Sequence, residues 1–233
     1  YIIDENIIGK SLSDDAPFIY SNNLFYLRKY FFYETQIINN LFERTAGYIN
    51  SLQIPNVDFN TLHKDKQDLA IAVAALGRFT IITGGPGTGK TTTVAKILKQ
   101  RFQADIDLKV ALIAPTGKAV VRLSESLASA KTRLDIGETM QKCFDQVNIK
   151  TIHSFLKLKP GYHPLDKPKE IISEYQLIIV DETSMVDIEL MYKLLSQISI
   201  DTHLIFLGDK NQLSSVGAGS VFGDLCASIL SDN

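Results

Sequence analysis

A glycine-rich stretch in the first half of the chain, GGPGTGKT over residues 84–91, has the spacing G-x-x-x-x-G-K-T. Glycines so spaced let successive backbone N–H groups converge on phosphate oxygens, and a helix starting there adds its positive dipole end. Lys90 would contact the β- and γ-phosphates of a nucleotide, and the Thr91 hydroxyl would bind Mg²⁺. The predicted phosphate-binding residues are Gly84, Gly85, Pro86, Gly87, Thr88, Gly89, Lys90, Thr91 and Thr92.

Two carboxylates follow an apolar run further along, in LIIVDET over residues 177–183. They would lie at the carboxyl edge of a sheet, where open α/β sheets bind their ligands. Asp181 would hold the metal through a water, and Glu182 would orient or deprotonate the attacking water, which implies hydrolysis. A helix N-cap is the alternative role for Asp181.

A third apolar run stops abruptly at Gly208-Asp209 and is followed by Gln212, in LIFLGDKNQLSSVGAG over residues 204–219. A strand tip at the same edge would let Gln212 contact the γ-phosphate or its attacking water and so report ATP versus ADP. An ordinary loop is the alternative. The sequence has no guanine-reading Asn/Thr-Lys-x-Asp motif where a GTPase needs it, so ATP is the expected nucleotide.

The elements that must position these residues alternate between helices and apolar strands, which predicts an α/β fold with a parallel sheet and flanking helices. The predicted strands are Phe79–Thr83, Lys109–Ala114, Gln176–Asp181 and His203–Gly208. The predicted helices are Asp65–Leu76, Lys90–Phe102, Gly117–Ala130 and Ile188–Gln197. Lys131–Pro168 is less regular, and we expect a surface excursion there.

The first sixty residues differ, because they hold twelve of the 21 Phe and Tyr residues. Apolar spacing predicts an amphipathic helix over Lys29–Asn50, and Pro17–Leu27 reads as a hairpin with Asn22-Asn23 in its turn. The aromatic stripe would form a small local core or a surface for a partner protein. Pro55–Thr61 reads as a linker.

Composition sets further limits. A chain of 233 residues with 45% hydrophobic and 21% charged residues can bury a sizeable core, and no apolar run approaches the roughly 18 residues of a membrane span. The net charge of −2 argues against a globally basic nucleic-acid binder, yet Lys109–Lys169 holds eleven Lys or Arg against five Asp or Glu. That surplus could hold a phosphate backbone or be a solvated face. Two cysteines are too few for a metal cluster, so reduced thiols are expected.

Three further stretches carry a family resemblance: APTGKAVVRLSESL (114–127), TIHSFL (151–156) and FLGDKNQLSSVGAGSVFGDL (206–225). They resemble motifs Ia, Ib and III of superfamily 1 helicases, with TGGPGTGKTTTVAKIL as motif I and VDETSMVD as motif II. The set is most similar to the RecD family, the alpha subunits of exodeoxyribonuclease V, and NNLFYLRKYFFYE is similar to the segment ahead of that motor. Thr183 departs from the Ala that close relatives often carry.

The resemblance implies roles for five more residues. Thr116, Lys118, Thr151 and His153 would bind DNA phosphates, although a packed or capping histidine is an equal alternative for His153. Gln67 stands where the family uses Gln to recognise adenine, and its amide offers the donor and acceptor this needs. A solvated helix residue is the alternative for Gln67.

The resemblance also implies an architecture and an activity. A RecA-like P-loop ATPase domain over residues 61–233 would follow a small, mostly helical partner-interaction region over residues 1–60. The family moves 5′ to 3′ on single-stranded DNA with ATP and Mg²⁺, joined to RecB and RecC in the bacterial cytoplasm for double-strand-break repair. Nothing resembling motifs IV to VI and their arginine fingers follows motif III, so this chain alone should bind ATP or ADP weakly and unwind nothing. A stand-alone RecD-like helicase and a nucleotide-binding interaction module are the alternatives.

Overall fold

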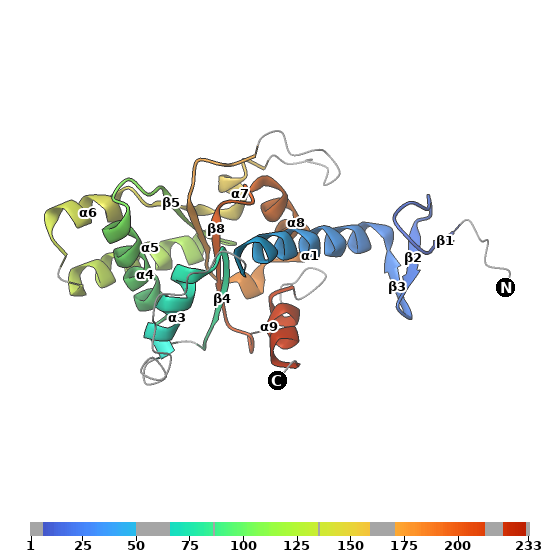
Figure 1. The fold of residues 1–233 in the computed structure, drawn as a ribbon, viewed down its shortest axis with the longest axis horizontal. Coiled ribbons are helices and arrows are strands. Elements are labelled where there is room, and N and C mark those ends of the chain that lie inside the picture. Colours follow the sequence, from blue (N-terminus) through green and yellow to red (C-terminus); the bar gives the residue numbers. More distant parts are fainter. Residues whose placement is uncertain are drawn as a thin grey trace.

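A five-stranded parallel sheet, ordered β4-β8-β7-β5-β6, forms the centre of the molecule (Figure 1). The computed structural model describes residues 7–49, 66–85, 87–134, 136–158, 171–212 and 221–231. The strands are β4 (Phe79–Thr83), β5 (Val110–Ala114), β6 (Asn148–Thr151), β7 (Leu177–Val180) and β8 (His203–Gly208). The predicted α/β fold with a parallel sheet is confirmed.

Helices cover both faces of this sheet because its inner strands are apolar on both sides; every residue of β5 and β7 is buried. One face packs on α3 (Lys66–Leu76), α4 (Lys90–Ala104), α5 (Gly117–Arg133) and α6 (Glu138–Asp145). The other face packs on α1 (Arg28–Ile49), α7 (Ile152–Phe155), α8 (Ile188–Gln197) and α9 (Val221–Ser231). Alternate strand residues therefore serve two separate cores.

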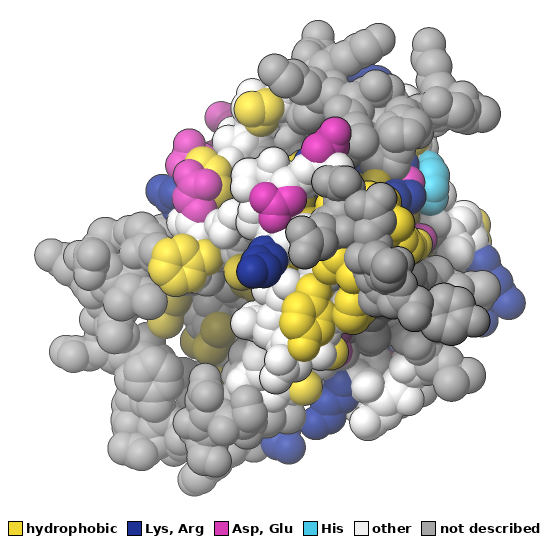
Figure 2. Space-filling view, turned by 90° about the vertical axis from the view of Figure 1, so that its right-hand side faces the viewer, with side chains coloured by type: hydrophobic (Ala, Val, Ile, Leu, Met, Phe, Trp, Pro, Cys, Tyr) yellow, Lys and Arg dark blue, Asp and Glu magenta, His cyan; other side chains and the backbone are white. Residues whose placement is uncertain are grey.

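The amino-terminal part forms a three-stranded sheet of β1 (Ile8–Gly9), β2 (Phe18–Ser21) and β3 (Leu24–Leu27), followed directly by α1. Asn22 and Asn23 both have positive φ, 50° and 63°, as a two-residue hairpin turn requires. The predicted hairpin is therefore confirmed. In Figure 1, α1 runs from the central sheet outward to this hairpin. Seen from the hairpin end, exposed hydrophobic side chains lie beside acidic and basic ones (Figure 2).

Helix α1 is fixed to the rest of the molecule by a buried arginine. Arg44 is 0% exposed, and its guanidinium donates to the carbonyls of Thr202 (2.8 Å) and Ile198 (3.2 Å), while Nε donates to Asn40 Oδ1 (2.8 Å). Burial lowers the pKa of Arg44 to about 10, so the group stays cationic at neutral pH. Ile37 and Leu41 of the same helix belong to one core with α8. The aromatic-rich helix thus contributes to the core of the central α/β fold.

The segment from Lys131 to Pro168, predicted as a surface excursion, is more regular than that. It contains α6, the sheet strand β6 and the single-turn helix α7 before the described residues stop at 158. Strand β6 was missed because it is four residues long and only partly buried, so it lacks the continuous apolar run of an inner strand. The predicted linker at Pro55–Thr61 lies outside the described residues.

Over the described part of the chain, no helix is long and apolar enough to cross a membrane. Cys143 and Cys226 are both buried and free, in line with the reduced thiols expected from the sequence.

The start of β8, at the edge of the sheet opposite the glycine-rich loop, carries a partly buried imidazole. Arg101 Nη2 of α4 donates to His203 Nδ1 at 2.7 Å and to the carbonyl of Ala74 at 3.2 Å. Burial, helped by the nearby charge of Arg101, lowers the pKa of His203 from 6.5 to about 4. Arg101, with a neutral His203 as acceptor, therefore joins α3, α4 and β8.

This pKa predicts how stability depends on pH. Between about pH 6.5 and 4 the unfolded chain binds a proton that the folded protein does not, so the free energy of unfolding should fall as the pH falls through this window. His203→Gln, whose side-chain oxygen can still accept from Arg101, should remove the part of this loss of unfolding free energy that comes from His203. Urea unfolding of both proteins at several pH values measures it, with the exposed His153→Gln as control. Parallel pH profiles for the wild type and His203→Gln would contradict the assignment.

Candidate functional site

The carboxyl ends of β4, β8 and β7 meet at one edge of the sheet. Their register pairs Thr83 with Gly208 and Val180 with Phe206, so the chain leaves all three strands at nearly the same level. Gly84 N–H donates to the Gly208 carbonyl at 3.1 Å, which continues the sheet into the glycine-rich loop. Three sequence stretches far apart in the chain are thereby brought together.

The glycine-rich loop has the conformation that its glycines allow. Gly87 and Gly89 have φ of 75° and 84°, in the left-handed region that favours glycine. A Cβ on Gly89 would also lie 2.5 Å from Gln67 Nε2, so no larger residue fits there without a shift. Lys90, the first residue of α4, folds its ammonium back onto the carbonyls of Gly84 and Gly85. A cation and the helix amino terminus thus lie at the same loop.

Gln67 of α3 lies against this loop. Its Nε2 donates to the carbonyl of Thr88 at 3.4 Å, and Lys96 Nζ donates to its Oε1 at 3.4 Å. The structure therefore brings Gln67 beside the glycine-rich loop, instead of leaving it as a solvated helix residue. Its role toward adenine stays a prediction.

The acidic pair follows β7 directly. Burial raises the pKa of the Asp181 carboxyl, and the charge of Glu182 acts in the same direction, while the Glu182 N–H at 2.9 Å and Lys90 act against it. Glu182 has φ 52° and ψ 38°, a left-handed conformation that costs about 1 kcal/mol or more for a residue with a Cβ. Such strain often marks functional positions.

Gln212, the third predicted catalytic residue, is tied to the segment after the acidic pair. The Ser184 hydroxyl donates to Gln212 Oε1 at 3.0 Å, and Gln212 N–H donates to the Asp209 carbonyl at 3.1 Å. Gly208 is needed where β8 ends, because a Cβ there would lie 2.7 Å from the Phe222 ring of α9. Pro86 and residues 213–220 lie outside the described residues.

A cleft of about 720 Å³ unites most of the predicted nucleotide site. It is lined by the acidic pair and by most of the loop and the start of α4: Gly85, Gly87, Thr88, Gly89, Lys90, Thr91, Thr92, Asp181 and Glu182. Its opposite wall is the polar side of α5, which the sequence reading missed: Arg122, Glu125, Ser126, Ser129 and Arg133. Their spacing of three to four residues is the signal that could have found them. Gln212 does not line this cleft; it lies next to it through Ser184.

The residues present fit Mg²⁺. Thr91 and Asp181 line the same cleft, and hydroxyl and carboxylate oxygens are the donors that this cation prefers. No group of three or more His, Cys, Asp or Glu that could hold a metal ion occurs among the described residues. Mg²⁺ bound with a nucleotide commonly takes one or two protein ligands and completes its shell with phosphate oxygens and water.

The predicted DNA-binding residues follow the neighbouring strands β5 and β6, where Ala114 pairs with Thr151. Both threonines are N-caps: Thr116 Oγ1 accepts from Ala119 N–H at 3.2 Å, and Thr151 Oγ1 accepts from Ser154 N–H at 3.1 Å. Each hydroxyl hydrogen can still donate to a phosphate. Lys118 and His153 are exposed, so His153 is not a packed histidine.

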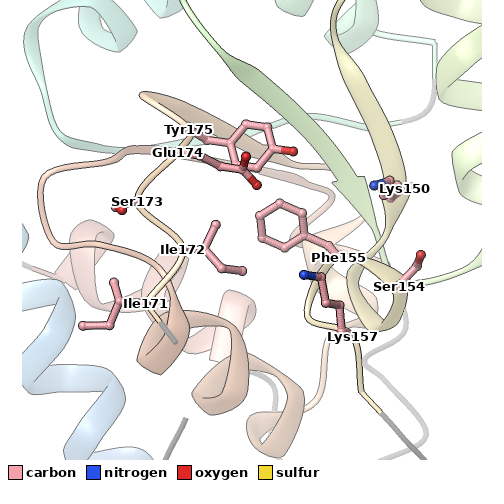
Figure 3. A pocket seen from close by; sticks show the side chains of 9 residues that line it. All are labelled: Lys150, Ser154, Phe155, Lys157, Ile171, Ile172, Ser173, Glu174 and Tyr175. Atoms are coloured by element: carbon pink, nitrogen blue, oxygen red, sulfur yellow. The ribbon is translucent and has the colours of Figure 1, made fainter. Parts of the chain in front are cut away.

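A cavity of about 260 Å³ opens between α7 and the chain that leads into β7 (Figure 3). Figure 3 shows Phe155 at its centre, and Lys150, Ser154 and Lys157 also line it. The Phe155 ring lies 5.5 Å from that of Tyr175. Lys150 and Lys157 lie close in sequence to Thr151 and His153, and the lysines of IKTIHSFLKLK (149–159) are the signal that sequence reading passed over.

Comparison with known proteins gives a consistent picture. A family model described as AAA domain matches residues 67–218. The RecBCD enzyme subunit RecD of Haemophilus influenzae is 39% identical over 176 residues, which are 69% of this chain and 26% of that protein. The RecD subunit of Buchnera aphidicola from Acyrthosiphon pisum is 34% identical over 91% of this chain and 36% of its own length. The chain thus spans about a third or less of these relatives.

Solved structures of similar fold include the UvsW helicase of bacteriophage T4, with a TM-score of 0.46 and 17% identity over 61% of this chain and 50% of that one. A DEAD box protein from Methanococcus jannaschii has a TM-score of 0.45 and 15% identity over 76% and 52% of the two chains. Likeness at this level supports no further argument.

The left-handed conformation of Glu182 makes a prediction about stability. Glu182→Gly should be more stable than Glu182→Ala by about 1 kcal/mol, because glycine adopts this φ without a steric cost. At Glu125, exposed within α5, the order should reverse by a similar amount, since glycine is the poorer helix former. Urea unfolding of the four variants measures both differences. An alanine variant at 182 as stable as the glycine variant would mean that the backbone there carries no strain.

Proposed function

The chain belongs to the AAA domain family, and from this premise we propose that it is the ATP-binding motor domain of a DNA helicase subunit of the RecD type. The observation that carries the proposal is the single cleft lined by the P-loop residues and by Asp181 and Glu182. A glycine-rich loop alone would serve any phosphate ligand. A partly buried carboxylate and a second acid on the same cleft suit nucleotide hydrolysis.

In the proposed mechanism, the loop amides and Lys90 bind the β- and γ-phosphates of ATP. Thr91 and Asp181 hold Mg²⁺, which neutralises developing phosphate charge when it is bound. Glu182 orients the attacking water and takes up its proton, with Lys90 and the α4 amino terminus fixing the phosphoryl group against it. Gln67 recognises the adenine from α3, beside the loop it contacts.

Single-stranded DNA is the proposed polymer, bound across β5 and β6 by Thr116, Lys118, Thr151 and His153. The side chains of these four residues are two hydroxyls, an ammonium and an imidazole, with no carboxylate among them, which suits binding to a phosphate backbone. Movement 5′ to 3′, assembly with RecB and RecC, and a place in the bacterial cytoplasm are proposed for the whole protein by analogy with the RecD relatives. The hairpin and α1, residues 7–49 of the proposed partner-interaction region, would face that assembly.

The stand-alone alternative has support of its own, because the ATP-dependent RecD2 DNA helicase of Deinococcus radiodurans is 35% identical over 61% of this chain and 17% of its own length. The RecD subunits match more of the chain, up to 91%, and so favour the complex subunit. Co-purification with RecB and RecC separates the two.

Nucleotide binding and turnover test the proposal. Lys90→Ala should weaken Mg-ATP binding at least about tenfold, because a charge-assisted contact to phosphate is lost. Glu182→Gln should keep ATP binding and lower DNA-stimulated hydrolysis by about 100-fold or more. Equilibrium titration and phosphate release of the full-length protein, with and without single-stranded DNA, measure these, with Lys99→Ala on the same helix as control. Unchanged turnover in Glu182→Gln, or turnover indifferent to DNA, would refute the motor assignment.

A substitution at Thr116 separates its two roles. Asp is as good an N-cap as Thr, so Thr116→Asp should leave the free energy of unfolding within about 0.5 kcal/mol of the wild type. The added negative charge should nevertheless weaken binding of single-stranded DNA about tenfold at low salt. Fluorescence anisotropy with a labelled oligonucleotide measures the affinity. Undiminished affinity would leave Thr116 with its capping role alone.

A further inference from the structure

The bond between Ser184 and Gln212 joins the two segments that follow β7 and β8, and the proposed mechanism gives Ser184 no part. Ser184 is only 7% exposed, and its hydroxyl donates to Gln212 Oε1 at 3.0 Å. The serine is the third residue after Asp181, so this contact lies directly beside the acidic pair. It is a side-chain bond between residues 28 positions apart.

Both partners are held in place by their own backbones. Ser184 lies in the 3₁₀ turn Thr183–Met185, where the fully buried Thr183 hydroxyl donates to the Val180 carbonyl at 2.9 Å. Met185 N–H closes the turn on the Glu182 carbonyl at 2.9 Å. Because the turn is fixed to β7, the serine hydroxyl has a defined position.

Gln212 is fixed in a similar way on its side. Asp209 Oδ1 accepts from Asn211 N–H at 2.9 Å, and the Asp209 carbonyl accepts from Gln212 N–H at 3.1 Å. Since β7 and β8 are hydrogen-bonded neighbours, with Val180 opposite Phe206, the two turns start from adjacent points of the sheet.

The chemistry of this bond restricts what Gln212 can do. A glutamine carboxamide has an oxygen that accepts and an NH₂ group that only donates. The bond to Ser184 uses one of the two lone pairs of this oxygen and fixes the oxygen on the serine side, so the NH₂ group is the part of Gln212 that is left to turn toward a ligand. Phosphate oxygens only accept hydrogen bonds, so an NH₂ donor matches the γ-phosphate and not the proton of an attacking water.

We propose that Ser184 is a positioning residue, which occupies the carboxamide oxygen of Gln212 and thereby presents its N–H donors to the γ-phosphate of ATP. Gln212 then distinguishes ATP from ADP, and Glu182 alone handles the attacking water. This inference rests on the proposed nucleotide-binding function and assigns one of the two roles that the sequence left open for Gln212.

The test compares the affinities of a nonhydrolysable ATP analogue and of ADP, each with Mg²⁺, for the chain of residues 1–233. Gln212→Glu keeps an acceptor for Ser184 but replaces the donors by a negative charge. It should lower the preference for the ATP analogue about tenfold or more and leave ADP affinity unchanged. Gln212 is exposed, so this variant should fold normally.

Ser184→Ala should lower the same preference about threefold to tenfold in the wild-type background and have no effect in Gln212→Ala, because it acts through the glutamine. Ser184→Thr keeps the hydroxyl and should restore the preference. Ser196→Ala, a serine of α8 whose hydroxyl donates to the Lys193 carbonyl, is the matched control. Thermal melting of each variant identifies any loss of folding.

The outcomes separate the inference from the proposed function. Failure of the wild-type chain to bind either nucleotide would refute nucleotide binding itself. Equal affinity of the wild type for both nucleotides would overturn the role of Gln212 while leaving nucleotide binding intact. A Ser184→Ala effect of the same size with and without Gln212 would show that the serine does not act through it.

Discussion

Strand β8 lies between β4 and β7 and is hydrogen-bonded to both, and the geometry of the cleft depends on this order. Neighbouring strands lie about 4.8 Å apart, so one intervening strand separates the ends of β4 and β7 by about 10 Å. That spacing leaves room for a phosphate chain and a hydrated cation between Lys90 and Asp181. Direct pairing of β4 with β7 would bring the Lys90 ammonium and the Asp181 carboxylate close enough to neutralise each other. The intervening strand also ends beside the cleft, where it supplies Gln212.

The sequence allowed the catalytic edge to be predicted because its signals are local. Four of the five strands are mostly apolar runs, and the glycine-rich loop and acidic pair follow two of them directly. The short edge strand β6 and helices α6 and α7 escaped prediction because few of their residues are buried in a periodic pattern. Asp181 could be predicted because it directly follows an apolar strand. Arg122 was missed because the polar side of α5 becomes part of the cleft only when the helix is packed.

Local sequence patterns could not predict the residues whose roles depend on a partner far away in the sequence. Nothing in the spacing of Ser184 and Gln212 indicates a bond across 28 positions. The threonines show a different limit: Thr116 and Thr151 were predicted from resemblance as DNA ligands, and the structure adds that each caps a helix. One hydroxyl can do both, so the same residue type at the same position is favoured by folding and by binding, and the sequence cannot separate the two causes.

The anchor of α1 has an unusual asymmetry. Arg44 binds main-chain carbonyls of Ile198, Ile200 and Thr202, and no carboxylate takes part in these bonds. Main-chain acceptors survive almost any exchange of side chain, so the receiving segment is free to change its sequence without losing the anchor. Arg44 has no such freedom, because a lysine ammonium cannot match its planar fork of donors. Over evolutionary time, the segment around Ile198–Thr202 can therefore change its sequence, while Arg44 must be kept for α1 to stay attached to the ATPase fold.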